Sequence, residues 1–194
     1  LAADESAVDF GGELIPAAIN NYNVQAHLFN DYWEDIGTIR PFYQANLDLA
    51  SPLQKFNFFD AESPIYTRSR YLPPSKLHGC DIDNSMVSEG CIMSGVYARN
   101  SIIGLRSRLD RGVRLEDSII MGSDFFESIE DISANLKSGT PHIGIGEDTI
   151  VRRAIIDKDV IIPPHSEIGY DREADAQRFT VTESGLVVIA KGTK

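Results

Sequence analysis

One three-residue phrase recurs through the second half of the chain and limits the folds that this sequence can adopt. A small residue followed by two apolar residues forms each copy, and the copies begin 16, 17 and 36 residues apart, at Ser85, Ser101, Ser118 and Ala154. Shorter β-branched triplets lie between them, so that a triplet recurs every five or six residues. Triplets this short cannot form hairpins or alternate with helices. They predict a hexapeptide parallel β-helix with three short strands per turn.

The main alternative for this region is an all-β sandwich. A sandwich predicts longer strands, with turns about every 8–12 residues, and the sequence from residue 80 lacks that spacing. We therefore assign residues 80–194 to a β-helix, interrupted by an insertion at about 122–148. Within the insertion, apolar residues at helical spacing from Phe125 to Leu136 predict a helix.

The N-terminal part of the chain has a mixed α/β pattern. Apolar spacing predicts one helix within residues 10–20 and a second one beginning after Thr38, whose hydroxyl is a suitable cap. Residues 24–29 predict a short strand between the two helices. The apolar face of the second helix would consist of Ile39, Phe42, Tyr43 and Leu47.

Composition excludes several functional classes. The chain carries 18 Lys and Arg against 29 Asp and Glu, a net charge of −11, which argues against a general nucleic-acid binder. No apolar run approaches the roughly 18 residues of a membrane-spanning helix, and the first residues lack the pattern of a signal peptide. The two cysteines, Cys80 and Cys91, predict no disulfide framework, so we expect a cytoplasmic location. The sequence does not begin with Met, and we expect a processed product or a fragment.

Asp35 is the first candidate for chemistry. It would follow the predicted strand and precede the predicted helix, at a sheet edge where α/β folds bind ligands. Gly37 permits close approach of the backbone, and a helix start offers free amide groups to an anion. A carboxylate in this position suits Mg²⁺-dependent phosphoryl chemistry. The simpler alternative is that Asp35 and Thr38 only cap a turn.

Two further groups of side chains are candidates. A basic cluster can bind a phosphorylated small molecule, or it can form ion pairs with neighbouring acids. Its members are Arg99, Arg106, Arg108, Arg111 and Arg114, followed by Arg152 and Arg153 in a later turn. His142 and His165 lie in turns of the repeat, where hexapeptide acyltransferases place a general base; the alternative for each is a solvent-exposed turn residue.

Several runs of residues resemble a known family. Residues 33–39 read Trp-Glu-Asp-Ile-Gly-Thr-Ile, and residues 72–76 read Leu-Pro-Pro-Ser-Lys. With residues 9–16, 64–67, 104–108 and 155–158, they resemble the C-terminal portion of ADP-glucose pyrophosphorylase (glucose-1-phosphate adenylyltransferase). The resemblance implies a mainly β protein: a left-handed β-helix over 80–194, preceded by the residual α/β tail of a nucleotidyltransferase domain over 1–50. An extended, Pro-rich linker over 51–79 would join them.

The resemblance also implies an activity and a set of site residues. The parent enzyme would make ADP-glucose and pyrophosphate from ATP and glucose 1-phosphate with Mg²⁺, in glycogen or starch synthesis. It would act as a homo- or hetero-tetramer in the cytoplasm, or in the plastid of a plant. Asp35 matches the family's metal-binding aspartate near the sugar phosphate, with the substrate-binding Trp33 beside it. Four residues match positions of the allosteric region that binds a phosphorylated effector: Lys158, Lys191, Arg70 and Arg178.

One part of the family pattern has no match in this sequence. Family members carry a Gly-rich nucleotide loop with an arginine near their N-terminus, and we therefore expect the isolated chain to be inactive. Two alternatives remain open. One is a regulatory or assembly module without chemistry of its own, and the other is a hexapeptide acyltransferase that uses His142 or His165.

Overall fold

The computed structural model describes residues 9–194 of the chain. The chain divides into two units, Leu1–Trp33 and Glu34–Lys194. In the first unit, a π-helical turn, η1 (Phe10–Leu14), continues into α1 (Ile15–Ile19). A carboxylate oxygen of Asp9 accepts the Gly12 N–H at 2.8 Å and caps this segment. The helix predicted within residues 10–20 is confirmed.

The strand predicted over residues 24–29 is not formed. These residues are exposed and belong to no helix or strand. A strand needs a partner that takes up its N–H and C=O groups, and the described part of this unit contains no other strand. The first strand of the described residues begins at Lys76. The expectation that Asp35 follows a strand at a sheet edge was therefore wrong.

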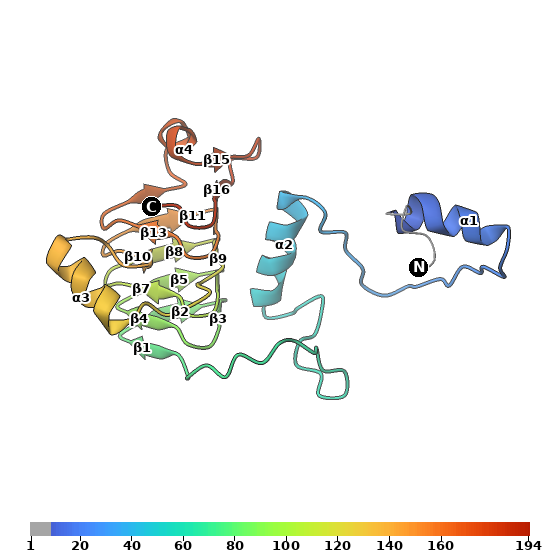
Figure 1. Ribbon diagram of the computed structural model, residues 1–194, viewed down its shortest axis with the longest axis horizontal. Helices are drawn as coiled ribbons and strands as arrows, with labels where there is room; N and C mark the ends of the chain where they lie inside the picture. Colours follow the sequence, from blue (N-terminus) through green and yellow to red (C-terminus); the bar gives the residue numbers. More distant parts are fainter. Residues whose placement is uncertain (1–8) are drawn as a thin grey trace. The chain divides into compact units, whose positions relative to one another are not determined.

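The core of the second unit is a parallel β-helix built from short strands (Figure 1). The strands are β1 (Lys76–His78), β2 (Asp81–Asp83), β3 (Met86–Val87), β4 (Ile92–Ser94), β5 (Tyr97–Arg99), β6 (Ile102–Ile103), β7 (Arg108–Leu109), β8 (Arg114–Glu116), β9 (Ile119–Ile120), β10 (Gly144–Ile145), β11 (Ile150–Arg152), β12 (Ala154–Ile156), β13 (Ile161–Ile162), β14 (Glu167–Ile168), β15 (Thr180–Val181) and β16 (Val187–Ile189).

These strands stack into three sheets, one on each side of the coil. Sheet A has the order β1-β4-β7-β10-β13, sheet B the order β14-β11-β8-β5-β2, and sheet C the order β15-β16-β12-β9-β6-β3. All neighbours pair in parallel except β15 and β16. From β4 to β14 and in β16, the register places one inward apolar residue of each strand above the next. These residues are almost fully buried: Met93, Leu109, Ile145 and Ile162 in sheet A; Ala98, Leu115, Val151 and Ile168 in sheet B; Ile103, Ile120, Ile156 and Ile189 in sheet C.

A ladder of serines runs along the corner between sheets B and C. The Ser85 hydroxyl accepts the backbone N–H of Ser101 at 3.1 Å, and the Ser101 hydroxyl accepts that of Ser118 at 3.3 Å. The Ser118 hydroxyl accepts the N–H of Ala154 at 3.3 Å. Each hydroxyl also donates to the carbonyl two residues before it, as for Ser101 and Arg99 at 2.8 Å. The small first residue of the repeated phrase therefore serves to satisfy the backbone at this corner.

Two helices interrupt or close the β-helix. Helix α3 (Ile129–Ser138) begins with a capping box between Ser128 and Asp131 and ends at Gly139, which adopts a left-handed conformation. It begins later than the predicted start at Phe125 because Ser128 supplies the cap. Strand β10 pairs with β7, so the coil resumes at Gly144, before the end of the insertion that the sequence predicts at about residue 148. Helix α4 (Arg172–Arg178) lies between β14 and β15, near the C-terminal end of the β-helix.

Helix α2 (Ile39–Ala50) packs on the outer face of sheet C. The outward residues of sheet B are mostly charged, whereas those of sheet C form an apolar row: Met86, Ile102, Ile119, Ile155 and Val188. Leu47 belongs to one buried cluster with Ile119 and Ile155 of this row. The Tyr43 hydroxyl donates to the Asp117 backbone carbonyl at 2.5 Å. Three of the four residues of the predicted apolar face, Phe42, Tyr43 and Leu47, thus contact the β-helix.

Residues 52–75, between α2 and β1, contain neither helix nor strand and are largely exposed. The end of this segment attaches to the first coil, because the Ser75 hydroxyl donates to the Ser88 carbonyl at 2.5 Å and the Gly90 N–H donates to the Pro73 carbonyl at 2.9 Å. No helix among the described residues is both long enough and apolar enough to cross a membrane.

Candidate functional site

Lys158 and Lys191, which the sequence analysis singled out separately, meet at one carboxylate. The Lys158 Nζ lies 2.6 Å from Oδ1 of Asp124, and the Lys191 Nζ lies 2.5 Å from Oδ2 of the same residue. The three side chains come from three coils, since Asp124 follows β9, Lys158 follows β12 and Lys191 follows β16. We call Asp124, Lys158, Lys191 and the neighbouring Asp159 the lysine cluster.

The backbone of three stacked corners sets the position of the lysine cluster. The Asp159 N–H donates to the Gly122 carbonyl at 3.1 Å, and the Gly192 N–H donates to the Lys158 carbonyl at 3.0 Å. Gly122 has a φ of +88°, and a Cβ at this position would lie 2.0 Å from the Leu105 carbonyl oxygen. A side chain therefore cannot be accommodated at Gly122 without a shift of the backbone.

Asp159 connects the members of the lysine cluster. Its Oδ1 accepts the backbone N–H of Asp124 at 2.8 Å, and its Oδ2 lies 3.6 Å from the Nζ of Lys191. The Asp159 side chain is only 12% exposed, whereas the Asp124 and Lys191 side chains are 41% and 55% exposed. Asp159 is thus the fixed member of the cluster, and the other carboxylate faces solvent.

The charges of the lysine cluster stabilise one another. The hydrogen bonds from Lys158 and then from Lys191 lower the pKa of Asp124 to about 2. The hydrogen bond to Asp124 raises the pKa of Lys191. Asp124 is therefore ionised at neutral pH, and it presents one negative charge to two ammonium groups.

The sequence analysis identified the two lysines and missed both aspartates. The signal for Asp124 and Asp159 lay in the stacking of Ile120 on Ile156, since Asp124 is the fourth residue after Ile120 and Asp159 is the third residue after Ile156. Because the coils that contain Ile120 and Ile156 stack in register, the residues that follow these two isoleucines lie at the same corner of the β-helix. Asp124 falls within the insertion predicted at about 122–148, and this assignment obscured the stacking.

Asp35 lies in an extended, exposed segment that leads into α2. Its Oδ1 accepts the Gly37 N–H at 3.0 Å, which leaves the second oxygen available. A Cβ added at Gly37 would lie 3.2 Å from the same oxygen, a tight contact that a small shift of the exposed Asp35 carboxylate would relieve. Thr38 occupies the N-cap position of α2, but its side chain makes no capping hydrogen bond, so the expected hydroxyl cap was wrong. Trp33 is 74% exposed.

The other two anion-site candidates make contacts of their own. The Arg70 guanidinium donates to the Arg68 carbonyl at 3.1 Å. The Arg178 guanidinium lies over the Phe179 ring, 4.7 Å from its centroid, at the end of α4. The structure thus brings together Lys158 and Lys191, and it gives Arg70 and Arg178 different partners.

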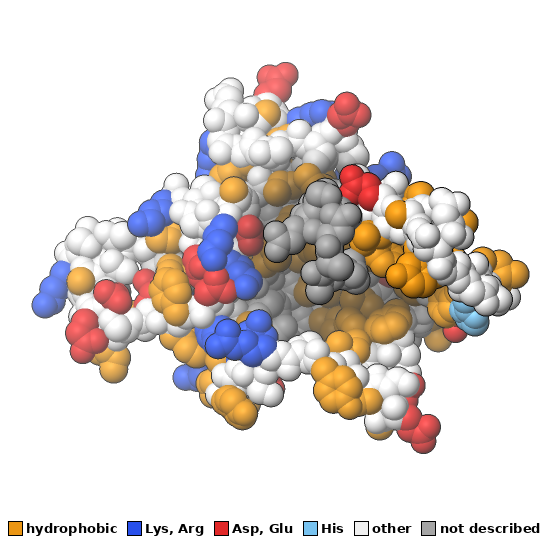
Figure 2. All heavy atoms as spheres, turned by 45° about the vertical axis from the view of Figure 1, so that its right-hand side comes forward, with side chains coloured by type: hydrophobic (Ala, Val, Ile, Leu, Met, Phe, Trp, Pro, Cys, Tyr) orange, Lys and Arg blue, Asp and Glu red, His pale blue; other side chains and the backbone are white. Residues whose placement is uncertain are grey.

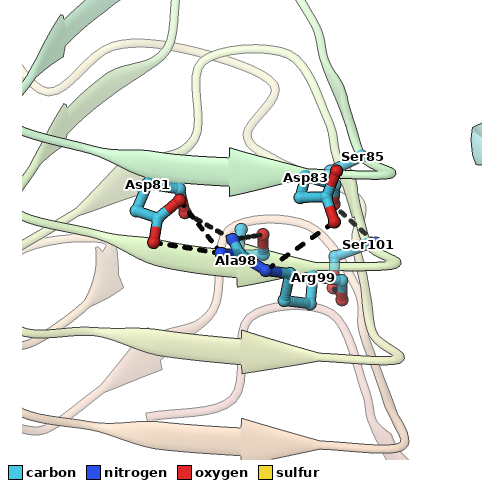
Figure 3. Close-up of polar contacts among 6 residues, drawn as sticks. All are labelled: Asp81, Asp83, Ser85, Ala98, Arg99 and Ser101. Carbon is cyan, nitrogen blue, oxygen red and sulfur yellow. Dashed lines mark hydrogen bonds and ion pairs between the residues drawn. The ribbon is translucent and has the colours of Figure 1, made fainter.

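Three of the seven arginines of the basic cluster form ion pairs on the outside of the coil. Arg99 binds both carboxylate oxygens of Asp81 at 3.0 Å and lies 3.9 Å from Asp83 (Figure 3). Arg108 pairs with Asp110 at 3.7 Å, and Arg152 pairs with Glu116 at 3.8 Å. On the face that Figure 2 presents, basic and acidic side chains lie beside one another. These contacts favour the ion-pair interpretation of the cluster over a phosphate site.

The geometry of His142 does not suit a general base. Its Nε2 lies 2.6 Å from Oδ2 of Asp110, and its Nδ1 lies 2.9 Å from the Ile143 carbonyl oxygen. Both partners are acceptors, so the ring satisfies both contacts only when each nitrogen carries a proton. Burial opposes protonation, but the bonds to Asp110 and Ile143 outweigh it and raise the pKa of His142. His165 is exposed, 3.9 Å from Asp148.

Comparison with known families identifies the class of this protein. A family model described as nucleotidyl transferase matches residues 1–52, and a model described as the GLGC left-handed parallel beta-helix domain matches residues 70–194. The protein is thus related to the nucleotidyltransferases and carries a left-handed β-helix. The chain belongs to the GLGC left-handed parallel β-helix domain family. The two matches confirm the resemblance to the C-terminal part of an ADP-glucose pyrophosphorylase-like protein.

Proposed function

We propose that this chain is the C-terminal part of a glucose-1-phosphate adenylyltransferase, which forms ADP-glucose and pyrophosphate from ATP and glucose 1-phosphate. The observation that carries the proposal is the order of the two family matches along one chain, a nucleotidyl transferase segment followed by the GLGC β-helix. The Trp-Glu-Asp-Ile-Gly-Thr run supports the choice of substrates. We further propose that the whole enzyme is a tetramer serving glycogen or starch synthesis, in the cytoplasm or plastid.

In this enzyme, Asp35 would bind Mg²⁺ and Trp33 would lie beside the sugar phosphate. The carboxylate is suitable, because it is exposed and has one oxygen left after its bond to Gly37. Mg²⁺ usually takes one or two carboxylates and completes its shell with substrate phosphates and water. The described residues contain no group of three or more His, Cys, Asp or Glu that could hold a metal ion, so Asp35 would supply only one of its ligands. When bound, the ion would neutralise charge on the ATP phosphates.

The β-helix would be the assembly and regulatory part of the enzyme. Lys158 and Lys191 would bind the phosphate of an effector, and Arg70 and Arg178 would supply further anion contacts. The proximity of the two ammonium groups supports this role, because a pair of cations at one point of an acidic protein attracts a small anion. For the chain alone we propose no catalysis, since it lacks a match to the Gly-rich loop. In isolation it would be a regulatory and assembly module.

The test of this function uses the protein encoded by the longest reading frame that contains this sequence. ADP-glucose formation from ATP and glucose 1-phosphate is measured for this protein and its Asp35→Asn variant. We expect turnover to fall at least about 100-fold in the variant, because a metal-binding charge is lost while the shape is kept.

Asp31→Asn is the matched control for this measurement. Asp31 also accepts a neighbouring backbone N–H, that of Tyr32 at 2.7 Å, but it has no proposed role. Unchanged turnover in Asp35→Asn at limiting Mg²⁺ would show that Asp35 only shapes a turn. Absence of ADP-glucose formation by the wild-type protein would show that the proposed activity is wrong.

A further inference from the structure

The lysine pair already holds an anion supplied by the chain itself. One oxygen of Asp124 contacts Lys158, and the other contacts Lys191. We propose that Asp124 is an intramolecular competitor, whose carboxylate occupies the lysine pair and is displaced when the phosphate group of a ligand binds. This inference rests on the proposed effector-binding role of Lys158 and Lys191 and adds the group that regulates access to them.

The geometry shows that the two lysines suit one small anion. The ammonium groups come from separate coils, yet a single carboxylate reaches both, at 2.6 and 2.5 Å. Two oxygens of one phosphate group are separated by a similar distance to the two oxygens of a carboxylate. A phosphate can therefore take the place of the Asp124 carboxylate without movement of the lysine backbones, which the Gly192–Lys158 hydrogen bond holds together.

The charges favour the exchange. Asp124 shares the two ammonium groups with Asp159, which lies 3.6 Å from Lys191. A phosphate monoester carries about −1.5 to −2 charges at neutral pH and has three acceptor oxygens, so it binds the two ammonium groups more strongly than the single carboxylate of Asp124. The side chains of Lys158, Lys191 and Asp124 are 35%, 55% and 41% exposed, so a ligand can reach the pair from solvent. Exposed ion pairs contribute little individually, and water readily solvates the displaced carboxylate.

The backbone of Asp124 can stay in place during the exchange. Its N–H is bound by Asp159, which is nearly buried, so rotation about the side-chain bonds is enough to release the carboxylate. Asp159 also lies 3.6 Å from Lys191 and continues to orient that ammonium group. In the lysine cluster, the Asp159 carboxylate thus stays in place, and the Asp124 carboxylate is the one that a ligand can displace.

The experiment measures binding of inorganic phosphate to the 194-residue chain by calorimetry at low ionic strength. We expect Asp124→Asn to lower the Kd of phosphate about tenfold, because the apparent Kd is divided by the fraction of open sites and two exposed ion pairs leave about one-tenth of the sites open. The Lys158→Ala/Lys191→Ala double variant should bind no phosphate saturably. Glu130→Gln, which removes a carboxylate from α3 in the same insertion, should bind like wild type.

A second measurement follows the displacement in the unmodified chain. The ¹³Cγ resonance of Asp124, recorded at neutral pH, should move to the position of a free carboxylate as phosphate saturates the protein. A resonance that stays unchanged while phosphate binds would overturn the inference, whatever the Asp124→Asn variant does.

The possible results separate the two proposals. If wild type and Asp124→Asn bind phosphate equally and the lysine double variant does not bind, the competitor role is wrong and the lysine site stands. If Glu130→Gln tightens binding as much as Asp124→Asn, the effect is one of net charge and the competitor role is also wrong. If neither wild type nor Asp124→Asn binds phosphate saturably, or if the double variant binds like wild type, the proposed effector site falls as well.

Discussion

Replacement of Leu47 by Ala is predicted to weaken the attachment of α2 to sheet C and to leave the β-helix intact. Leu47 is 6% exposed and belongs, with Ile119, Ile155 and Leu186, to a buried cluster separate from the interior of the coil. Truncation of a buried leucine costs about 2–5 kcal/mol. The helix lies on an outer face and can partly close the gap, so we expect about 2–3 kcal/mol.

Native-state hydrogen exchange tests this prediction, because it reports the opening of α2 separately from global unfolding. The α2 amides should exchange about 30- to 150-fold faster in Leu47→Ala, since each 1.4 kcal/mol corresponds to a factor of ten. Exchange in β8, β9 and β12 should change little.

Ile39→Ala is the matched control on the same helix, because Ile39 is 43% exposed. It should accelerate exchange only slightly. If Leu47→Ala left α2 exchange at the wild-type rate, the packing described here would not be what holds the helix. If it accelerated exchange equally in all three sheets, α2 and the β-helix would form a single cooperative unit.

Three further predictions concern the β-helix. The pKa of His142 lies above that of a histidine in the unfolded chain. The contribution of His142 to stability is therefore complete below about pH 6.5 and is lost as the pH rises through the folded pKa. The melting temperature of the wild type should fall over this pH range, and that of His142→Gln should fall much less. Gly122→Ala should cost at least about 2 kcal/mol by chemical denaturation, because its Cβ would meet the Leu105 carbonyl, and a wild-type midpoint would contradict the backbone geometry. Ser101→Ala should cost about 1–3 kcal/mol, because the buried Ser118 N–H loses its acceptor, and a loss below about 0.5 kcal/mol would show that the serine ladder is not needed.

The β-helix could be predicted from the sequence because its pattern is local and repeated. Each triplet presents one inward apolar residue, and residues such as Ile103 and Ile120 stack at positions that the repeat alone specifies. For the packing of α2, the sequence predicted the apolar face of the helix but not the surface on which it packs. The apolar face was evident in Phe42 and Leu47, but its partner is a row of outward apolar residues that becomes a surface only when the coils stack.

The site was less predictable than the fold for a physical reason. Lys158 and Lys191 were identified by resemblance, but Asp124 comes from another coil and contacts them through the register of three strands. The strand predicted over residues 24–29 was wrong for a different reason. Its local pattern suited a strand, but the described residues around it supply no partner for its backbone.

The serine ladder has a consequence for how this architecture tolerates changes in length. The rung from Ser118 to Ala154 spans 36 residues and the one from Ser101 to Ser118 spans 17, yet both bonds measure 3.3 Å. The additional 19 residues (36 − 17), which correspond to the excursion containing α3, therefore leave the spacing between coils unaltered. Lengthening such an excursion costs mainly loop-closure entropy, about 0.6 kcal/mol for each doubling of its length. The β-helix can therefore accept insertions of different length at a corner without a change in the spacing between its coils.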